Sequence, residues 1–242
     1  MTYSGSTKRS NVLIIIPAYN EGENIKNIVE ELRSGYPQYD YVVINDGSSD
    51  DTGKILREQG YNHVTCPINL GIGGAIQTGY QYAREKGYDV AVQLDGDGQH
   101  DPAYIGDIVQ PILDDQADYV IGSRFVNKEG FQSSVTRRIG IRFLSGLITV
   151  LCFRKIKDVT SGFRAVNRFF INAFAGSYPI DYPEPEAIMD AVMRRKRIME
   201  LPVVMRERET GTSSINLRRS VYYMIKVTLD IIVCRISYGI RR

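Results

Sequence analysis

The chain contains the stretch Asp89-Val-Ala-Val-Gln-Leu-Asp95-Gly-Asp97-Gly-Gln-His100. An apolar run ends there in two carboxylates one residue apart, and an amide and an imidazole follow. Alternate residues at a strand end can direct their oxygens into one small volume. Such oxygens suit Mg²⁺ or Mn²⁺, which often bind through one or two carboxylates and complete their coordination with substrate phosphates. Asp95 and Asp97 therefore predict a divalent-cation site for a phosphorylated substrate. Taken alone, so short a motif is equally typical of an acidic turn after a core strand.

The first half of the chain alternates between apolar, β-branched runs and helical spacing. Strands are predicted at about 11–17, 39–45, 63–66, 89–94 and 119–122, with helices at about 24–33, 54–59, 75–86 and 102–113. This alternation is typical of a parallel α/β sheet, in which ligands bind at the carboxyl ends of the strands. Polar segments follow three of the strands: Pro17-Ala-Tyr-Asn-Glu21, Asn45-Asp-Gly-Ser48 and Asp95-Gly-Asp97. We expect these segments to converge on one crevice.

The second half of the chain is less regular. The sequence predicts a basic helix at about 134–153, a loop or edge strand at 158–164, a helix at about 186–196, a strand at 198–206 and a final helix at about 217–238. No internal repeat or low-complexity linker interrupts it. We therefore expect a flexible N-terminus at 1–10, one continuous domain at 11–216 and a C-terminal amphipathic helix at 217–242.

The two halves differ strongly in charge. Residues 1–123 contain 8 Lys and Arg against 18 Asp and Glu, whereas residues 124–242 contain 22 against 10. A basic second half indicates an anionic partner, such as a phosphate, a nucleic acid or an acidic membrane surface. Nucleic acid is not expected, because the chain has no recognised reading motif and no basic-aromatic platform.

The expected location is the cytoplasm. Three scattered cysteines, at positions 66, 152 and 234, form no Cys-x-x-Cys pair and suggest a reducing compartment. The polar first residues lack the apolar core of a signal peptide. No run reaches the ~18–20 apolar residues that cross a bilayer, because Lys226, Asp230 and Arg235 interrupt the longest apolar segment. We do not expect the chain to cross a membrane unaided.

Seven segments, in this order, resemble the motifs of one enzyme family: Pro17–Glu21, Asn45–Asp50, Asn69–Ala75, Asp95–His100, Gly122–Arg124, Ser161–Arg164 and Arg208–Ser213. They cover about residues 11–214. The chain resembles the inverting glycosyltransferases of family 2, and especially the branch of dolichyl-phosphate mannosyltransferase and bacterial polyprenyl-phosphate glycosyltransferases. The resemblance implies an α/β fold of the GT-A nucleotide-sugar-binding type, with a mostly parallel central sheet flanked by helices and a helical C-terminal extension. Two departures stand out. Asn45 precedes Asp46 where the family usually has two acids, and a chain without Trp lacks the Gln-x-x-Arg-Trp motif of processive polysaccharide synthases.

The resemblance also implies a donor site for a UDP- or GDP-linked sugar. Asp46 would accept hydrogen bonds from the base, and Asp95 would lie near the ribose and the Mg²⁺ or Mn²⁺ ion. Asp97 and Gln99 would hold the ion against the diphosphate. The remaining donor-site residues would be Pro17, Ala18, Tyr19 and Glu21 around the nucleoside, and Asn69 and Gly71 near the ribose. We interpret the glycine-rich segment at 71–74 as mainly structural.

The chemical class of the acceptor determines which further catalytic residues are needed. A phosphate monoester is largely dianionic at neutral pH and needs no general base; it needs cationic donors, for which Arg is well suited. The candidate acceptor-phosphate residues are Arg124, Arg137, Arg138, Arg208 and Ser213, with Arg124 and Arg164 also expected to act in catalysis. If the acceptor is a hydroxyl, Asp158 is the first candidate for the general base, followed by Glu184 and Glu186.

The leading hypothesis is sugar transfer to a polyprenyl phosphate at the inner face of the cell membrane, for cell-surface glycan synthesis. Transfer to a hydroxyl of a glycan, lipid or protein is the alternative, and a silent nucleotide-sugar-binding subunit is a third. The C-terminal helix has a narrow polar stripe and a broad apolar surface. That surface is predicted to pack on the body of the chain, to form a homo-oligomer, or to dock on membrane lipid or a small membrane partner.

Overall fold

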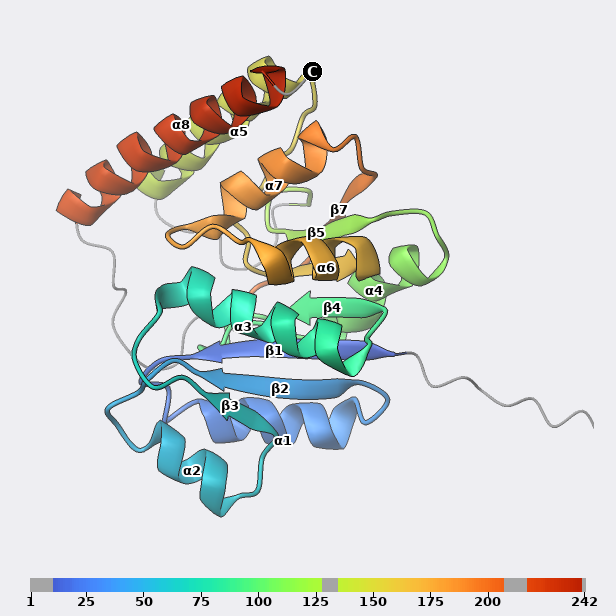
Figure 1. Ribbon diagram of the computed structural model, residues 1–242, viewed down its shortest axis with the longest axis vertical. Helices are drawn as coiled ribbons and strands as arrows, with labels where there is room; N and C mark the ends of the chain where they lie inside the picture. The colour runs from blue at the N-terminus through green and yellow to red at the C-terminus, as the bar shows by residue number, and fades with distance from the viewer. Residues whose placement is uncertain (1–10, 128–134, 207–216, 241–242) are drawn as a thin grey trace, which may run out of the picture.

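The computed structural model describes residues 11–127, 135–206 and 217–240, and a seven-stranded sheet lies at its centre (Figure 1). The sheet order is β3-β2-β1-β4-β6-β5-β7. Strands β1, β2, β3 and β4 are mutually parallel, and β7 runs parallel to β5. The strand bounds are Val12–Ala18 (β1), Asp40–Asn45 (β2), His63–Thr65 (β3), Val90–Gln93 (β4), Tyr119–Ser123 (β5), Arg164–Asn167 (β6) and Ile198–Pro202 (β7).

Strand β6 corrects one expectation. The sequence predicted a loop or edge strand at 158–164, but the strand begins at Arg164 and lies inside the sheet, antiparallel to both β4 and β5. It is only four residues long and carries no alternating pattern that the sequence could reveal. Its place is decided by pairing with two strands that are distant in the sequence.

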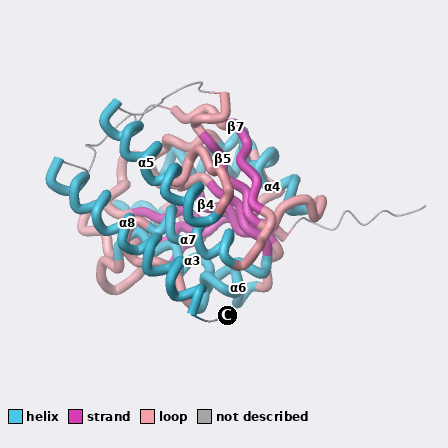
Figure 2. The backbone as a smooth tube through the Cα atoms, turned by 90° about the horizontal axis from the view of Figure 1, so that it is seen from above, coloured by secondary structure: helices cyan, strands magenta, loops and turns pink. Residues whose placement is uncertain are grey.

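Helices cover both faces of the sheet, as Figures 1 and 2 show. Alternate residues of β1 enter opposite cores: Val12, Ile14 and Ile16 face one, and Leu13 and Ile15 face the other. The first core is closed by α1 (Ile25–Gly35), α2 (Thr52–Glu58), α4 (Ile105–Leu113) and the short 3₁₀ turn η1 (Pro102–Tyr104). The second is closed by α3 (Gly71–Lys86), α5 (Val135–Cys152), α6 (Arg168–Gly176), α7 (Pro183–Met193) and α8 (Leu217–Ile240).

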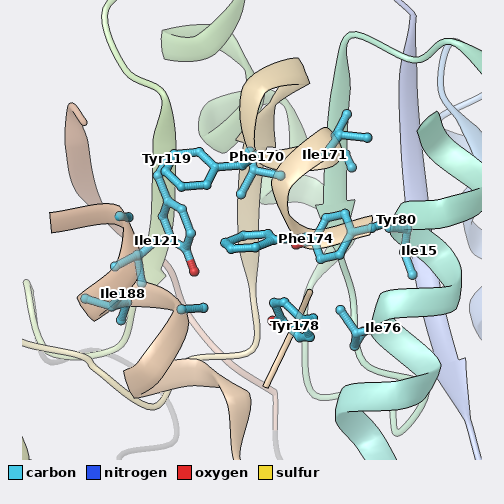
Figure 3. Close-up of a cluster of buried hydrophobic side chains, with 14 of the residues drawn as sticks. Ile15, Ile76, Tyr80, Tyr119, Ile121, Phe170, Ile171, Phe174, Tyr178 and Ile188 are labelled. Atoms are coloured by element: carbon cyan, nitrogen blue, oxygen red, sulfur yellow. The ribbon is translucent and has the colours of Figure 1, made fainter. Parts of the chain in front are cut away.

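Helix α6 was not predicted. Asn167 caps it, because its side-chain oxygen accepts a hydrogen bond from the Phe170 amide at 3.3 Å. Phe170 and Phe174 are buried at helical spacing and join Tyr80 of α3 and Tyr119 of β5 in an aromatic cluster (Figure 3). The cap and this spacing are sequence signals that could have revealed the helix.

Two glycines allow α3 to lie flush against its neighbours. A Cβ on Gly79 would overlap the Ile15 side chain of β1, and a Cβ on Gly73 would overlap the Pro179 and Ile180 carbonyl oxygens. The Gly73 amide also donates to the Ile180 oxygen at 3.0 Å. These contacts agree with a structural role for the glycine-rich segment, and they place the start of α3 beside the carboxyl end of the sheet.

Helices α5 and α8 lie side by side at one end of the molecule, where α8 packs on both α7 and α5 (Figures 1 and 2). Val227 and Ile231 of α8 are buried in the second core. Among the described helices, none combines the length and the apolar character that a membrane span needs.

Candidate active site

The carboxyl ends of β2, β1 and β4 meet at one edge of the sheet. The Asp46 amide, directly after β2, donates to the Ala18 carbonyl at the end of β1 at 2.9 Å. On the other side of β1, a Cβ on Gly96 would lie only 2.7 Å from the Pro17 carbonyl oxygen. The Asp46 segment and the Asp95–Asp97 segment therefore flank the same turn, as the strand alternation predicted.

The loops after β1 and β2 hold each other in place. Asn20 adopts the left-handed region with φ 55°, and its side-chain oxygen accepts the Ser49 amide at 2.9 Å. Asp50 in turn accepts hydrogen bonds from the Gly22 amide and from the Thr52 amide and hydroxyl. Burial opposes ionisation of Asp50, but these hydrogen bonds outweigh it and lower the pKa of the carboxyl.

The residues expected around the nucleoside lie in this turn. Pro17 and Ala18 are buried, whereas the Tyr19 ring is half exposed. Glu21 is partly buried and accepts a hydrogen bond from the Asn24 side chain at 2.8 Å. The turn thus offers backbone, an aromatic ring and a carboxylate beside Asp46 and the Asp95–Asp97 segment.

Asp46 is nearly fully buried beside the start of α3. One of its carboxylate oxygens accepts the Leu70 amide at 2.7 Å. Asn69 accepts the Gly71 amide at 3.0 Å, and Gly71 has φ +78°, a conformation that favours glycine. The expected ribose residues Asn69 and Gly71 are therefore held against Asp46. Asn45 instead accepts the Ser48 amide of its own loop and donates to the Thr65 hydroxyl at the end of β3.

Hydrogen bonds and a ring contact hold the segment that carries Asp95 and Asp97 in place. The buried His100 ring accepts the Asp95 amide on Nδ1 at 3.0 Å, so the neutral ring carries its proton on Nε2, which lies 3.5 Å from Asp95 Oδ2. His100 also stacks on Phe163, with ring centroids 5.0 Å apart. Asp97 accepts the Gln99 amide at 3.1 Å.

The donor set fits a hard divalent cation. Within the described residues, no group of three or more His, Cys, Asp and Glu side chains is placed to hold a metal. Asp95 and Asp97 nevertheless offer carboxylate oxygens at a strand tip, and the Asp95 side chain is about one-third exposed. Two carboxylates with open access suit an ion whose other ligands are substrate phosphates.

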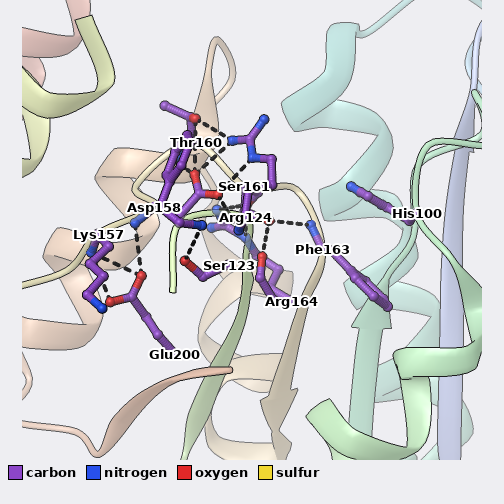
Figure 4. A network of polar contacts seen from close by, with 12 residues as sticks. His100, Ser123, Arg124, Lys157, Asp158, Thr160, Ser161, Phe163, Arg164 and Glu200 are labelled. Atoms are coloured by element: carbon purple, nitrogen blue, oxygen red, sulfur yellow. Dashed lines mark hydrogen bonds and ion pairs between the residues drawn. The ribbon is translucent and has the colours of Figure 1, made fainter. Parts of the chain in front are cut away.

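Arg124 and Asp158 form a buried, bidentate ion pair (Figure 4). Arg124 Nε and Nη2 donate to the two Asp158 oxygens at 2.8 Å each, and Nη2 also donates to the Thr160 hydroxyl at 2.9 Å. Burial alone would lower the pKa of Arg124, but the Asp158 carboxylate, and then that of Asp95, raise it.

Asp158 is fully buried and engaged by Arg124, so it is not placed where a general base would contact an acceptor. Removing one partner of a buried pair costs about 3–5 kcal/mol, so Asp158 also contributes to stability.

Arg164 lies inside the protein. It is fully buried, and its guanidinium donates to the Ser161 carbonyl, the Tyr119 hydroxyl and the Glu184 carbonyl. The structure therefore does not place Arg164 where an acceptor phosphate would contact it. It joins β6 to β5 and to the start of α7.

A basic groove of about 1000 Å³ runs along α5 beside the Arg124–Asp158 pair. Its cations are Arg138 and Arg142 of α5 and Lys155 and Lys157 of the following loop. Between them lie apolar and small residues: Phe125, Val126, Ile141, Ser145, Gly146, Thr149 and Val150.

Of the expected phosphate residues, Arg138 lines this groove. Arg137 lies on α5, but its side chain is outside the described residues, as are Arg208 and Ser213. Lys155 and Lys157 were not among the predicted phosphate residues, although basic residues on both sides of Ile156 could have revealed them.

Residues 13–174 match the family model described as Glycosyl transferase family 2. The chain belongs to this family. It is a glycosyltransferase, and the resemblance carried by its seven motifs is confirmed.

Similar proteins include several that are named for lipid phosphates. The glycosyltransferase is 34% identical over 213 residues to a protein of Methanococcus voltae named UDP-N-acetylglucosamine--dolichyl-phosphate N-acetylglucosaminyltransferase, covering 79% of this chain and 84% of that protein. It is 31% identical over 218 residues to the undecaprenyl-phosphate mannosyltransferase of Micrococcus luteus, covering 85% and 87%. It is 30% identical over 231 residues to the polyprenol monophosphomannose synthase of Mycolicibacterium smegmatis, covering 87% and 84%.

Solved structures share the fold. Glucosyl-3-phosphoglycerate synthase from Mycobacterium tuberculosis, in complex with Mn²⁺, uridine diphosphate and phosphoglyceric acid, superposes with a TM-score of 0.71 at 19% identity. The match covers 93% of this chain and 78% of that one. The predicted GT-A type of α/β fold, with its mostly parallel sheet, is confirmed.

Proposed function

We propose that this glycosyltransferase moves a sugar from a UDP- or GDP-linked donor to a polyprenyl phosphate, for cell-surface glycan synthesis. The observation that carries the proposal is the placement of the acidic strand ends of β1, β2 and β4 next to a basic groove. Asp95 at the end of β4 is one of the charges that raise the pKa of Arg124, and the two residues after Arg124 line the groove. The names of the relatives, which include dolichyl, undecaprenyl and polyprenol phosphates, support this acceptor class.

The donor would lie across the carboxyl ends of β1, β2 and β4. Asp46 would accept hydrogen bonds from the base, with Tyr19 and the backbone of Pro17 and Ala18 around the nucleoside. Asp95, Asp97 and Gln99 would hold Mg²⁺ or Mn²⁺, which neutralises charge on the departing nucleoside diphosphate. The Mn²⁺ and uridine diphosphate bound to glucosyl-3-phosphoglycerate synthase support such a group in this fold.

The acceptor would enter through the basic groove. Its cations suit a phosphate, and its apolar residues suit the first carbons of a prenyl chain. A phosphate acceptor needs no general base, which agrees with a buried Asp158 already engaged by Arg124. In-line attack by the phosphate oxygen on the anomeric carbon would release the nucleoside diphosphate and invert the configuration.

We also propose that α5 and α8 hold the enzyme on the inner face of the membrane. Helix α8 turns charged residues toward the protein: Lys226 pairs with Asp181, and Arg235 donates to the Leu151 carbonyl at 3.0 Å. Its outward face is apolar, with exposed residues Tyr222, Ile225, Leu229, Val233 and Ile236. Helix α5 adds exposed Phe143 and Val150. Apolar side chains next to basic ones suit an anionic lipid surface.

The test is a direct assay of transfer. The purified chain is incubated with a panel of radiolabelled nucleotide sugars, Mn²⁺ or Mg²⁺, and undecaprenyl phosphate in detergent. We expect a radiolabelled lipid with one donor of the panel. Label that reaches only hydroxyl acceptors, such as glycans or polyprenols, would contradict the proposed acceptor.

The same assay tests the metal site. Asp97→Ala should lose turnover by a factor of about 10³ or more, because the charge of the leaving group is no longer neutralised. EDTA should abolish the wild-type activity. Asp89→Asn is the matched control, since Asp89 lies at the opposite end of the same strand and pairs with Arg168 on the surface. Wild-type turnover by Asp97→Ala, or in EDTA, would rule out the metal role.

A further inference from the structure

Glu200 of β7 holds the loop that carries Asp158. Its carboxylate accepts the Lys157 amide, at 3.0 Å on Oε1 and 2.8 Å on Oε2, and the Asp158 amide at 2.9 Å on Oε1 (Figure 4). A carboxylate that accepts two consecutive amides fixes the position and direction of that backbone. Both oxygens of Glu200 are thus engaged by the loop between α5 and β6.

The constraint passes from this loop to Arg124. Asp158 follows Lys157 directly, is fully buried and accepts three hydrogen bonds from Arg124: from its amide at 3.1 Å, and from Nε and Nη2. A planar guanidinium bound in this bidentate way cannot turn independently of its carboxylate. The plane of Arg124 is therefore set by Asp158, and the place of Asp158 by Glu200.

The loop also positions a second cation. Lys157, whose amide Glu200 accepts, lines the basic groove, as do Phe125 and Val126 that follow Arg124. One carboxylate on β7 thus fixes the backbone of a groove lysine and, through Asp158, the arginine between the groove and Asp95.

We infer that Glu200 is a positioning residue for the acceptor phosphate, acting through Asp158 on Arg124 and through the backbone on Lys157. The inference rests on the proposed function for the identity of the acceptor. Glu200 itself does not contact the substrate. Its loss should therefore weaken use of the acceptor while leaving the donor site, at the carboxyl ends of β1, β2 and β4, unchanged.

The kinetic test compares Glu200→Ala and Glu200→Gln with the wild type in the full chain. We expect the KM for undecaprenyl phosphate to rise about tenfold in Glu200→Ala, because small displacements of positioning groups are costly. Glu200→Gln keeps one acceptor oxygen and should show a smaller rise, about threefold. The KM for the nucleotide sugar should stay within about twofold in both variants.

Asp118→Asn is the matched control for simple destabilisation. Asp118 lies just before β5 and accepts the Arg197 amide at 2.9 Å, so it joins the starts of β5 and β7 and does not contact Lys157 or Asp158 in the described structure. The control should lower the melting temperature without raising the acceptor KM. An equal rise of the acceptor KM in Asp118→Asn, or an unchanged acceptor KM in Glu200→Ala, would overturn the positioning role.

A measurement without substrate separates this inference from the proposed function. The Arg124 Nε–H group, assigned by NMR through its loss in Arg124→Lys, should be protected from solvent exchange in the wild type and at least tenfold less protected in Glu200→Ala. If the wild type does not glycosylate undecaprenyl phosphate, the proposed acceptor is wrong, and this signal still decides whether Glu200 orders Arg124. Unchanged protection in Glu200→Ala would refute the inference.

Discussion

At the scale of single residues, Gly162 and Asp95 lie unusually close. A Cβ on Gly162 would be 2.7 Å from Asp95 Oδ2 and 3.1 Å from Oδ1, which real side chains do not tolerate. The Asp95 carboxylate is also contacted by Gln93 Nε2 at 3.3 Å and approached by the His100 ring. The Asp95 carboxylate can keep this direction because Gly162 has no side chain, and Gln93 and His100 support it from other sides.

Gly162→Ala should therefore impair the donor site. The added methyl group forces Asp95 away from its present direction, and we expect the KM for the nucleotide sugar or the Mn²⁺ requirement to rise by about tenfold or more. Steady-state kinetics at varied donor and Mn²⁺ concentrations check this. Gly35→Ala is the control, since a Cβ there meets nothing within 4 Å. Unaltered donor and metal dependence in Gly162→Ala would show that Asp95 does not take part.

At the scale of elements, α8 turns its polar side toward the protein and its apolar side outward. The sequence predicted the polar stripe but not the side of the helix that faces the protein. Lys226 meets Asp181, and the Tyr223 ring packs edge-on against Tyr182 with centroids 4.7 Å apart, both on the segment before α7. Packing on the body therefore accounts for one side of the helix only. The apolar side remains exposed in the described part of the chain.

Leu229→Glu should weaken binding to lipid. The Leu229 side chain is 56% exposed, so the change should leave the fold intact, while the charge opposes insertion among acyl chains. We expect binding to vesicles that contain anionic lipid to fall about tenfold or more in a co-sedimentation assay. Leu113→Glu, at an exposed leucine at the end of α4, should bind as the wild type does. Full vesicle binding by Leu229→Glu, together with a change from dimer to monomer, would identify a second copy of the chain as the partner of this face.

At the scale of the whole molecule, the acidic and basic halves of the sequence lie in two different regions of the fold. The acidic first half provides the carboxylates at the ends of β2 and β4, and the basic second half provides α5, α8 and the cations of the groove. Strands β5, β6 and β7 join the two regions within one sheet. Arg124 lies at that junction, between Asp95 and the groove.

One ion pair across these strands should make stability depend on pH. Hydrogen bonds from Arg197 lower the pKa of Asp118 against the opposing effect of burial. A lowered folded-state pKa contributes stability that is present above the unfolded value, about 3.9, and is lost as the pH falls through the folded value. Asp118→Asn should thus melt about 2–4 °C lower at pH 7, and the difference should shrink below pH ~4. A constant difference between pH 7 and pH 3, measured by circular dichroism, would contradict this.

Much of the fold could be predicted because its signals are local. The apolar runs at β1, β2 and β4 mark buried strands, and Ile25, Ile28, Val29 and Leu32 mark one face of α1. Parallel strands joined by helices must align their carboxyl ends. The meeting of Asp46 with the Asp95–Asp97 segment thus follows from the order of the elements along the chain.

The sequence by itself determined the parallel α/β part of the fold, since continuous apolar runs and the helical period of 3.6 residues are local patterns. Only the tertiary structure decided where β6 inserts, that Arg164 is enclosed, and that Asp158 is held between Arg124 and Glu200. The physical reason is that partners such as Glu200 and Asp158 lie far apart in the sequence. A buried charge is stabilised by whichever acceptors and donors the fold brings to it, and no local spacing encodes them.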